Sequence, residues 1–119
     1  GPPPPSQPSA VYQDQWGATA MDVSADPTPV GVASSQSTKR KAESTAMAQC
    51  KARGGKACKV RLAYHNQCAV IAWGDGGSVV QSAASTEIAS GLAMKLCQQD
   101  GDAGCRIWYS DCSMAKRVE

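Results

Sequence analysis

Hydrophobic and polar residues follow one pattern twice along this chain. In each copy, a short apolar run precedes a helix-like segment that ends at a cysteine. A polar loop with glycine then leads to a second cysteine and a strand-like run. Residues 31–62 form the first copy and residues 78–109 the second, an offset of 47 residues (78 − 31) without a gap. A fixed offset of this kind indicates an internal structural repeat.

The first copy begins with two strands and a helix. Residues 16–21 and 30–35 are predicted to be strands that pair around a turn containing two prolines. Ser37 or Thr38 offers an N-cap for a helix that runs to Ala52. The inner face of this helix consists mostly of small residues, so we expect it to lie close to the sheet: Ala42, Ala46, Met47 and Cys50.

Further strands and a second helix follow. Residues 58–64 alternate polar and apolar side chains, which is typical of a half-buried strand. Residues 68–73 are continuously apolar and predict a buried central strand, which a Gly-rich turn joins to a strand over residues 78–83. Residues 105–109 form the last strand. The second helix is expected to bury one apolar stripe: Ile88, Ala89, Leu92, Ala93, Leu96 and Cys97.

Each copy therefore predicts a strand-strand-helix-strand unit. Two such units indicate an α+β fold, with a mostly antiparallel sheet of about six strands and both helices on one face. We expect a single duplicated domain over residues 15–112. Residues 1–14 are proline-rich and predict a disordered linker, and residues 113–119 predict a polar tail.

Six cysteines allow fifteen pairings, and the repeat narrows the choice. In both copies one cysteine ends the helix and the next opens a strand after the same seven-residue gap, which predicts Cys50–Cys58 and Cys97–Cys105. Each short loop contributes about 2–3 kcal/mol in the chain-entropy model. The remaining pair, Cys68–Cys112, is expected to link the two copies. Three disulfides indicate an oxidising compartment.

Composition and charge exclude several function classes. The net charge of +2 gives no argument for nucleic acid, and the one basic run, Lys39-Arg40-Lys41, is typical of a solvated helix face. With no C-x2-C pair and a single histidine, we expect no metal, and no glycine-rich motif predicts a cofactor. No apolar stretch reaches the roughly 18–20 residues of a membrane span.

The start of the chain suggests how the domain is attached. An exported protein needs a signal peptide, and none is present, so we expect the chain to be a mature or engineered form. The proline-rich lead suits a spacer behind an N-terminal lipid anchor, or a disordered end without a role.

Aromatic strand residues and two turns are the candidate partner-binding surface. Trp108 and Tyr109 are neighbours on a strand and must face opposite sides, so one lies on the less covered face, where Tyr64 can join it. Trp and Tyr are frequent interface hot spots. Turn residues His65, Asn66 and Asp75 are expected at the rim of this surface.

Three segments carry a family resemblance. They are W-G-A-T-A-M-D, then C-K-V-R-L-A-Y-H-N-Q-C-A-V-I-A-W-G, then C-R-I-W-Y-S-D-C. Across residues 15–112 they resemble the family of the domain of unknown function 4189. The resemblance implies an exported bacterial protein, with some members similar to immunity proteins of antibacterial effectors, and it supplies no catalytic motif. It implies the periplasm or envelope of a Gram-negative bacterium, or secretion.

Catalytic chemistry would have to start at His65, the only histidine. Asp75 and Asp111 are candidate acids, and Ser110 and Ser113 are candidate nucleophiles, but no spacing motif links them to His65. We therefore expect no enzyme. The predicted function is an immunity or inhibitor module that binds a cognate secreted effector, such as a cell-wall or membrane hydrolase. The alternatives are a small secreted enzyme or toxin, which would need His65 in a cleft, and a structural envelope protein.

Overall fold

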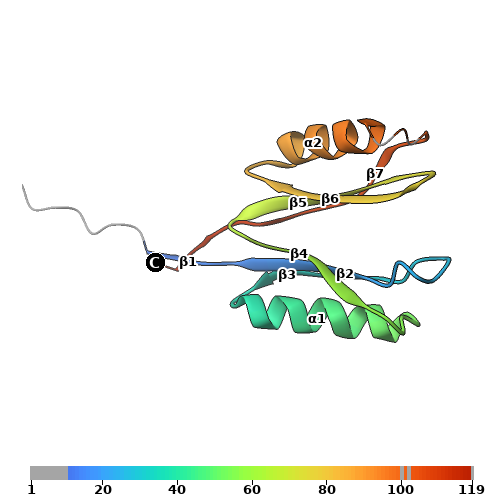
Figure 1. Ribbon diagram of the computed structural model, residues 1–119. Coiled ribbons are helices and arrows are strands. Elements are labelled where there is room, and N and C mark those ends of the chain that lie inside the picture. The colour runs from blue at the N-terminus through green and yellow to red at the C-terminus, as the bar shows by residue number, and fades with distance from the viewer. Residues whose placement is uncertain (1–10, 100, 102, 119) are drawn as a thin grey trace, which may run out of the picture.

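The computed structural model describes residues 11–99, 101 and 103–118. Within this range the chain folds into two strand-strand-helix-strand units (Figure 1). The first unit comprises β2 (Trp16–Met21), β3 (Val30–Gln36), α1 (Lys39–Ala52) and β4 (Lys59–His65). The second unit comprises β5 (Gln67–Gly74), β6 (Gly77–Ala83), α2 (Thr86–Gln99) and β7 (Arg106–Ser113).

The two units share one strand topology. Their sheets have the orders β3-β2-β4 and β6-β5-β7, and every strand pair is antiparallel. In both, the first strand of the unit is central and its two later strands lie at the edges. The predicted duplication and the α+β class are confirmed, together with the disulfide-stapled character of the fold.

The arrangement of the layers differs from the expected single six-stranded sheet. Two three-stranded sheets lie face to face, and α1 and α2 cover opposite outer faces rather than one common face (Figure 1). Only Asn66 separates β4 from β5, and its φ of 53° is in the left-handed region, which turns the chain sharply. Strand β5 therefore starts a second sheet instead of pairing with β4. Stacking also buries the apolar inner face of each sheet.

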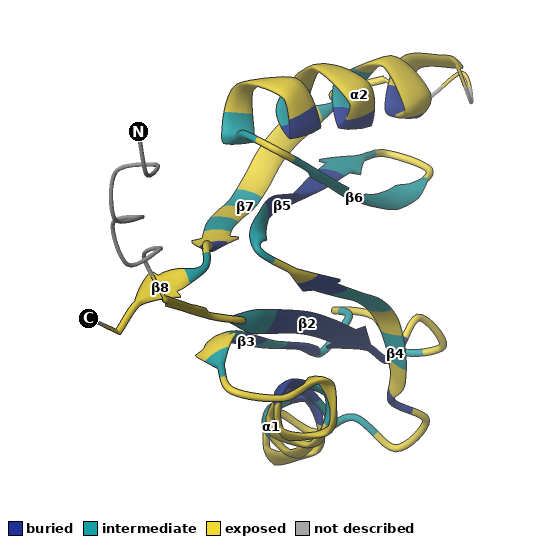
Figure 2. Cartoon of the chain, turned by 90° about the vertical axis from the view of Figure 1, so that its left-hand side faces the viewer, coloured by how far each residue is buried: buried dark blue, intermediate teal, exposed yellow. Residues whose placement is uncertain are grey.

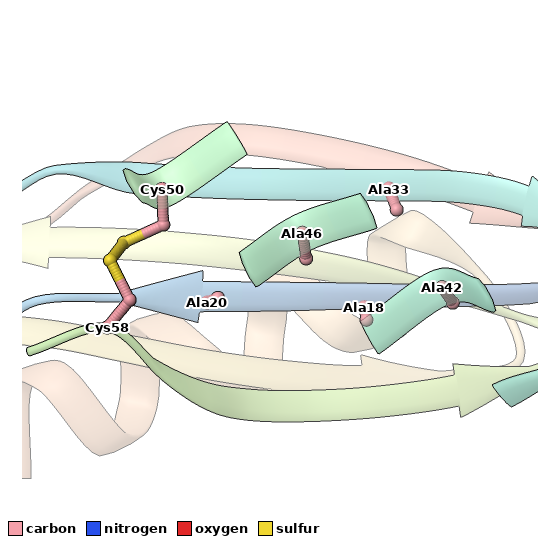
Figure 3. Packing of buried hydrophobic residues seen from close by; sticks show 7 residues of the cluster. All are labelled: Ala18, Ala20, Ala33, Ala42, Ala46, Cys50 and Cys58. Atoms are coloured by element: carbon pink, nitrogen blue, oxygen red, sulfur yellow. A yellow bond between two sulfur atoms is a disulfide. The ribbon is translucent and has the colours of Figure 1, made fainter. Parts of the chain in front are cut away.

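The contact between α1 and its sheet consists of small residues. Ala18, Ala20, Ala33, Ala42 and Ala46 are buried together there, beside the Cys50–Cys58 disulfide (Figure 3). The helix lies so close that a Cβ at Gly31 would sit 1.9 Å from the carbonyl oxygen of Ala46. Only glycine fits at this strand position.

Helix α2 packs in the same way, which contradicts part of the expected apolar stripe. Ala89, Ala93 and Cys97 are fully buried, and Figure 2 shows the buried residues on the side of α2 that faces the sheet. The larger side chains of this stripe instead lie on the flank of the helix and remain exposed: Ile88, Leu92 and Leu96. Close approach through alanine leaves no room for them underneath.

A third core cluster lies between the two sheets. Met21, Val30 and Ile71 are buried at its centre, with Trp73 and Tyr109 packed against them. Tyr64 Oη donates a hydrogen bond of 2.9 Å to Asp111 Oδ2 across the same interface. These two residues are 47 positions apart, the repeat offset, so the bond joins equivalent positions of the two copies.

The three disulfides join the pairs that the repeat predicts: Cys50–Cys58, Cys97–Cys105 and Cys68–Cys112. The expected role of the last pair was wrong. Cys68 and Cys112 are direct cross-strand partners on β5 and β7, so this bond lies within the second sheet and does not link the copies. With every cysteine paired, the chain belongs in an oxidising compartment outside the cytoplasm.

The two ends of the described chain also pair, which differs from the expected linker and tail. Strand β1 (Tyr12–Gln13) is antiparallel to β8 (Lys116–Arg117), and Val118 N donates to the Val11 carbonyl at 3.0 Å. The remainder of the predicted linker, residues 1–10, lies outside the described residues.

The two copies align in sequence without a gap, but in the structure part of strand β3 is shifted by one residue relative to its counterpart β6. Strand β3 contains one more residue than its β2 partner between the pairs at Trp16 and Ala18, and Ser35 there has a φ of 54°. Strand β6 pairs with β5 without such a bulge. As a result Val32 packs between the sheets, whereas its aligned counterpart Val79 packs against the α2 cluster. A one-residue shift reverses the face of a strand residue.

The close approach at Gly31 makes a testable prediction. Gly31→Ala places a methyl group against the α1 backbone, and we expect a loss of at least about 2 kcal/mol in unfolding free energy. Gly91→Ala on α2 is the control, because its Cβ would meet nothing within 4 Å and alanine favours a helix. Denaturant melts of dilute, oxidised protein measure both. Equal stability of the two variants would contradict the packing described for α1.

The Tyr64–Asp111 bond predicts how stability depends on alkaline pH. Burial of Tyr64, followed by its hydrogen bond to the Asp111 carboxylate, raises the pKa of the Tyr64 phenol well above its ordinary value. A raised tyrosine pKa gives stability that is complete below about pH 10 and lost as pH rises further. We expect Tyr64→Phe to lower the unfolding free energy by about 1–2 kcal/mol at pH 7. Above pH 10 the unfolding free energy of this variant should fall less steeply than that of the wild type. Parallel slopes for both proteins in melts from pH 8 to 11 would refute this assignment.

Candidate functional site

The structure does not bring the six predicted partner-binding residues into one surface. Tyr64 is only 2% exposed, and Tyr109 packs against the cluster between the sheets. His65 and Asn66 lie at the β4–β5 connection, near the terminal strands. Asp75 and Trp108 lie at the opposite end, with the β2–β3 loop. Tyr64 is therefore not available to a partner as predicted.

The residues of the β4–β5 connection have structural partners. His65 is exposed and stacks on Trp16, with ring centroids 4.6 Å apart. Asn66 Oδ1 accepts from Gln15 N at 3.0 Å, and Asn66 Nδ2 donates to Asp14 Oδ1 at 2.9 Å. These contacts hold the start of the domain against the turn. Asn66 thus anchors the chain rather than forming a rim.

A cavity opens between the sheets at the other end of the molecule. Trp108 is 49% exposed and meets Trp73 edge to face at a centroid distance of 5.7 Å. The cavity has a volume of about 300 Å³ and is lined by Asp26, Pro27, Thr28, Val30, Trp73, Arg106 and Trp108.

A second hollow lies beside the first, and both share Asp26, Thr28 and Trp73 as lining residues. Its volume is about 640 Å³, and its remaining lining consists of the polar residues Arg61, Asp75 and Ser78 together with Val23, Gly76, Gly77 and Val79. We call the two hollows together the end cleft. It joins an aromatic half around Trp108 to a polar half around Arg61.

Two equivalent β-bulges point side chains into the end cleft. The register of β4 against β2 skips Arg61, and that of β7 against β5 skips Trp108. These residues are aligned in the repeat, where C-K-V-R-L matches C-R-I-W-Y. A bulge bends its strand and re-aims a side chain, often beside a functional site. The alignment of the two copies is the sequence signal that could have identified Arg61 and Trp108 as equivalent residues.

The wall formed by the β2–β3 loop is held in place by Asp22. Asp22 is 2% exposed, and its carboxylate accepts from Ser24 N and Oγ and from the backbone N–H groups of Lys56 and Ala57. The bond from the Ser24 side chain, followed by those from Ala57 and Lys56, lowers the pKa of Asp22 to about 2. The loop is therefore tied to the α1–β4 connection rather than free.

Arginines surround the end cleft. Arg61 and Arg106 line its two halves, and Arg53 lies with Trp108 beside Pro29. Arg53 Nη1 donates to the Val30 carbonyl at 2.7 Å, and Arg61 Nη1 donates to Ser78 Oγ at 3.2 Å. Guanidinium groups bind carboxylates, and indole rings contribute large apolar area. This combination is suited to binding an acidic and apolar ligand.

In the described part of the chain there is neither a cluster of metal ligands nor an acid hydrogen-bonded to His65. No group of three or more His, Cys, Asp or Glu side chains there could hold a metal ion. Neither candidate acid is hydrogen-bonded to His65 among the described residues: Asp75 lines the end cleft, and Asp111 accepts from Tyr64. Ser113 Oγ is likewise engaged, accepting from Ser35 N at 3.0 Å.

The role of Asp22 predicts a loss of stability in acid. A lowered carboxyl pKa gives stability that is present above the ordinary value near pH 4 and lost as pH falls toward about 2. Asp22→Ala should lower the thermal midpoint of unfolding at pH 7. Between pH 4 and pH 2 the midpoint of this variant should decline less than that of the wild type. The control is Asp26→Ala, an exposed loop residue. An unchanged acid profile in Asp22→Ala would disprove the anchoring role.

The comparisons with known proteins agree with this fold. The NMR structure of Rv1813c from Mycobacterium tuberculosis superposes with a TM-score of 0.57 at 19% identity, covering 91% of this chain and 80% of that chain. No curated protein matches the sequence, and no described helix is long and apolar enough to cross a membrane. Residues 16–112 match the model of the domain of unknown function DUF4189, so the chain belongs to the DUF4189 family.

Proposed function

We propose that this domain is a binding module that recognises a protein partner through the end cleft. The observation that carries the proposal is the bulged Trp108, which is 49% exposed and set against Trp73 beside Arg106. Trp and Arg dominate the binding energy of many interfaces, particularly where they sit together at a pocket. Covering a large exposed aromatic ring contributes about 2–3 kcal/mol.

The arginines indicate the chemistry of the partner. Arg53, Arg61 and Arg106 lie around the cleft, and among the described residues that line it the carboxylates are those of Asp26 and Asp75. A loop that carries Asp or Glu beside an apolar or aromatic side chain complements this surface. The carboxylate meets guanidinium donors, and the apolar group packs on Trp108 and Pro27.

The scaffold supports tight binding because the cleft walls are already fixed. The bulges are part of paired strands, and Asp22 ties down the loop that carries Pro27. Cys50–Cys58 closes the neighbouring connection, and Cys97–Cys105 closes its counterpart in the second copy. A preorganised surface loses less entropy when it binds.

We propose further that the partner is a cognate secreted antibacterial effector, such as a cell-wall or membrane hydrolase, and that the domain is its immunity or inhibitor protein. The disulfides suit the periplasm or envelope of a Gram-negative bacterium, where such an effector acts. A tether through an N-terminal lipid anchor would keep the inhibitor at the membrane. The three segments resemble the DUF4189 family, some members of which are similar to immunity proteins, and this resemblance supports the same role.

The test is inhibition and binding with the purified product of the neighbouring effector gene. The oxidised full chain should bind it in calorimetry and suppress its hydrolytic activity. Trp108→Ala should weaken binding roughly tenfold to a hundredfold through loss of the aromatic anchor. His65→Ala, at the opposite end of the molecule, is the control and should bind normally.

Two outcomes would overturn the proposal. One is wild-type chain that neither binds nor inhibits the effector. The other is binding that Trp108→Ala leaves intact. An intrinsic activity of the chain that His65→Ala abolishes would instead establish the small-enzyme alternative.

A further inference from the structure

The flank of α2 carries an apolar stripe that α1 lacks. Ile88, Leu92 and Leu96 follow one another at four-residue spacing and are 53%, 43% and 41% exposed. The aligned positions on α1 hold polar residues: Lys41, Thr45 and Gln49. Both helices bury the same alanine and cysteine positions, so neither fold unit needs this stripe for its own core. The apolar residues are an addition specific to the second copy.

A polar row runs along α2 beside the stripe. Glu87, Gly91 and Lys95 are also four residues apart, and all three are exposed. A Cβ at Gly91 would meet no atom within 4 Å, so the helix has an open notch at this point. Neither Glu87 nor Lys95 forms an ion pair with a described residue. The charges are opposite and lie at equal distances from the notch.

This pattern is complementary to itself. If two α2 helices lie antiparallel about a two-fold axis at Gly91, residue 87 of each copy comes opposite residue 95 of the other. Glu87 then meets Lys95 of the second copy, and the same pair forms a second time by symmetry. Rows at four-residue spacing interlock when helices pack, and the Gly91 notch admits an apolar side chain from the facing row.

We infer that a second copy of this chain docks on α2, forming a two-fold dimer through an antiparallel α2–α2 contact. The occupant is an identical chain because the acidic and basic ends of the polar row match each other when reversed. A membrane surface would instead favour a polar face rich in Lys and Arg. The inference does not rest on the proposed function. Since α2 covers the outer face of its sheet, the dimer leaves both end clefts open (Figure 1).

Sedimentation equilibrium on the oxidised full chain tests the dimer. The mass should rise from that of the 12.4 kDa chain toward twice this value as concentration increases. Leu92→Glu buries charge in the contact and should leave only monomer. Thr45→Glu at the aligned position of α1 is the matched control and should dimerise like wild type. A chain that stays monomeric up to millimolar concentration overturns the inference.

Charge reversal tests the antiparallel geometry without placing a charge in the apolar stripe. Glu87→Lys alone and Lys95→Glu alone each place like charges opposite one another twice, so each should dimerise roughly tenfold more weakly. An equimolar mixture of the two variants should recover the dimer, because every facing pair is then of opposite sign. The antiparallel contact is overturned if the mixture does not dimerise like the wild type, or if each single variant dimerises as strongly as the wild type. Circular dichroism confirms that each variant is folded.

Discussion

The contact between the two sheets is the interaction on which this fold depends. Met21, Val30 and Ile71 are buried there, and Tyr64 bonds Asp111 across the interface between equivalent positions of the repeat. Separated, each copy would be a three-stranded sheet with one helix and an uncovered apolar face. The disulfides do not replace this contact, because each closes a connection or a strand pair within one copy. Duplication therefore supplies each sheet with the surface that covers it.

Small residues set the distance between helix and sheet in both copies. Ala42 and Ala46 in α1, and Ala89 and Ala93 in α2, occupy matching buried positions. Where the helix approaches this closely, larger side chains cannot fit beneath it and are left on its flank. The same packing thus allows the flank to vary without cost to the core, so it is polar on α1 and apolar on α2.

The end cleft arises where the paired architecture becomes irregular. Arg61 and Trp108 occupy the same position in the repeat and the same kind of bulge, yet they carry different chemistry. The eight-residue β2–β3 loop, held by Asp22, has no equal in the second copy, where two residues join β5 to β6. A nearly symmetric scaffold thereby acquires one asymmetric site, with an aromatic half and a polar half.

The sequence by itself determined the repeat, the order of the elements, the cysteine pairs and the family, because these depend on local periodicity and spacing. Strand 16–21 and the helix ending at Ala52 agree with the structure to the residue. Of the predicted binding residues, Asp75 and Trp108 line the end cleft, whereas Tyr64 is buried. Only the tertiary structure decided that the strands form two sheets, that Cys68–Cys112 lies within one of them, and that Ile88, Leu92 and Leu96 stay outside. The exposed stripe follows from the close packing of Ala89 and Ala93 on the sheet. The two-sheet arrangement and the end cleft depend on one-residue events, which are the turn at Asn66 and the bulges at Arg61 and Trp108. Such events change which face a side chain takes, and local hydrophobic patterns do not encode them.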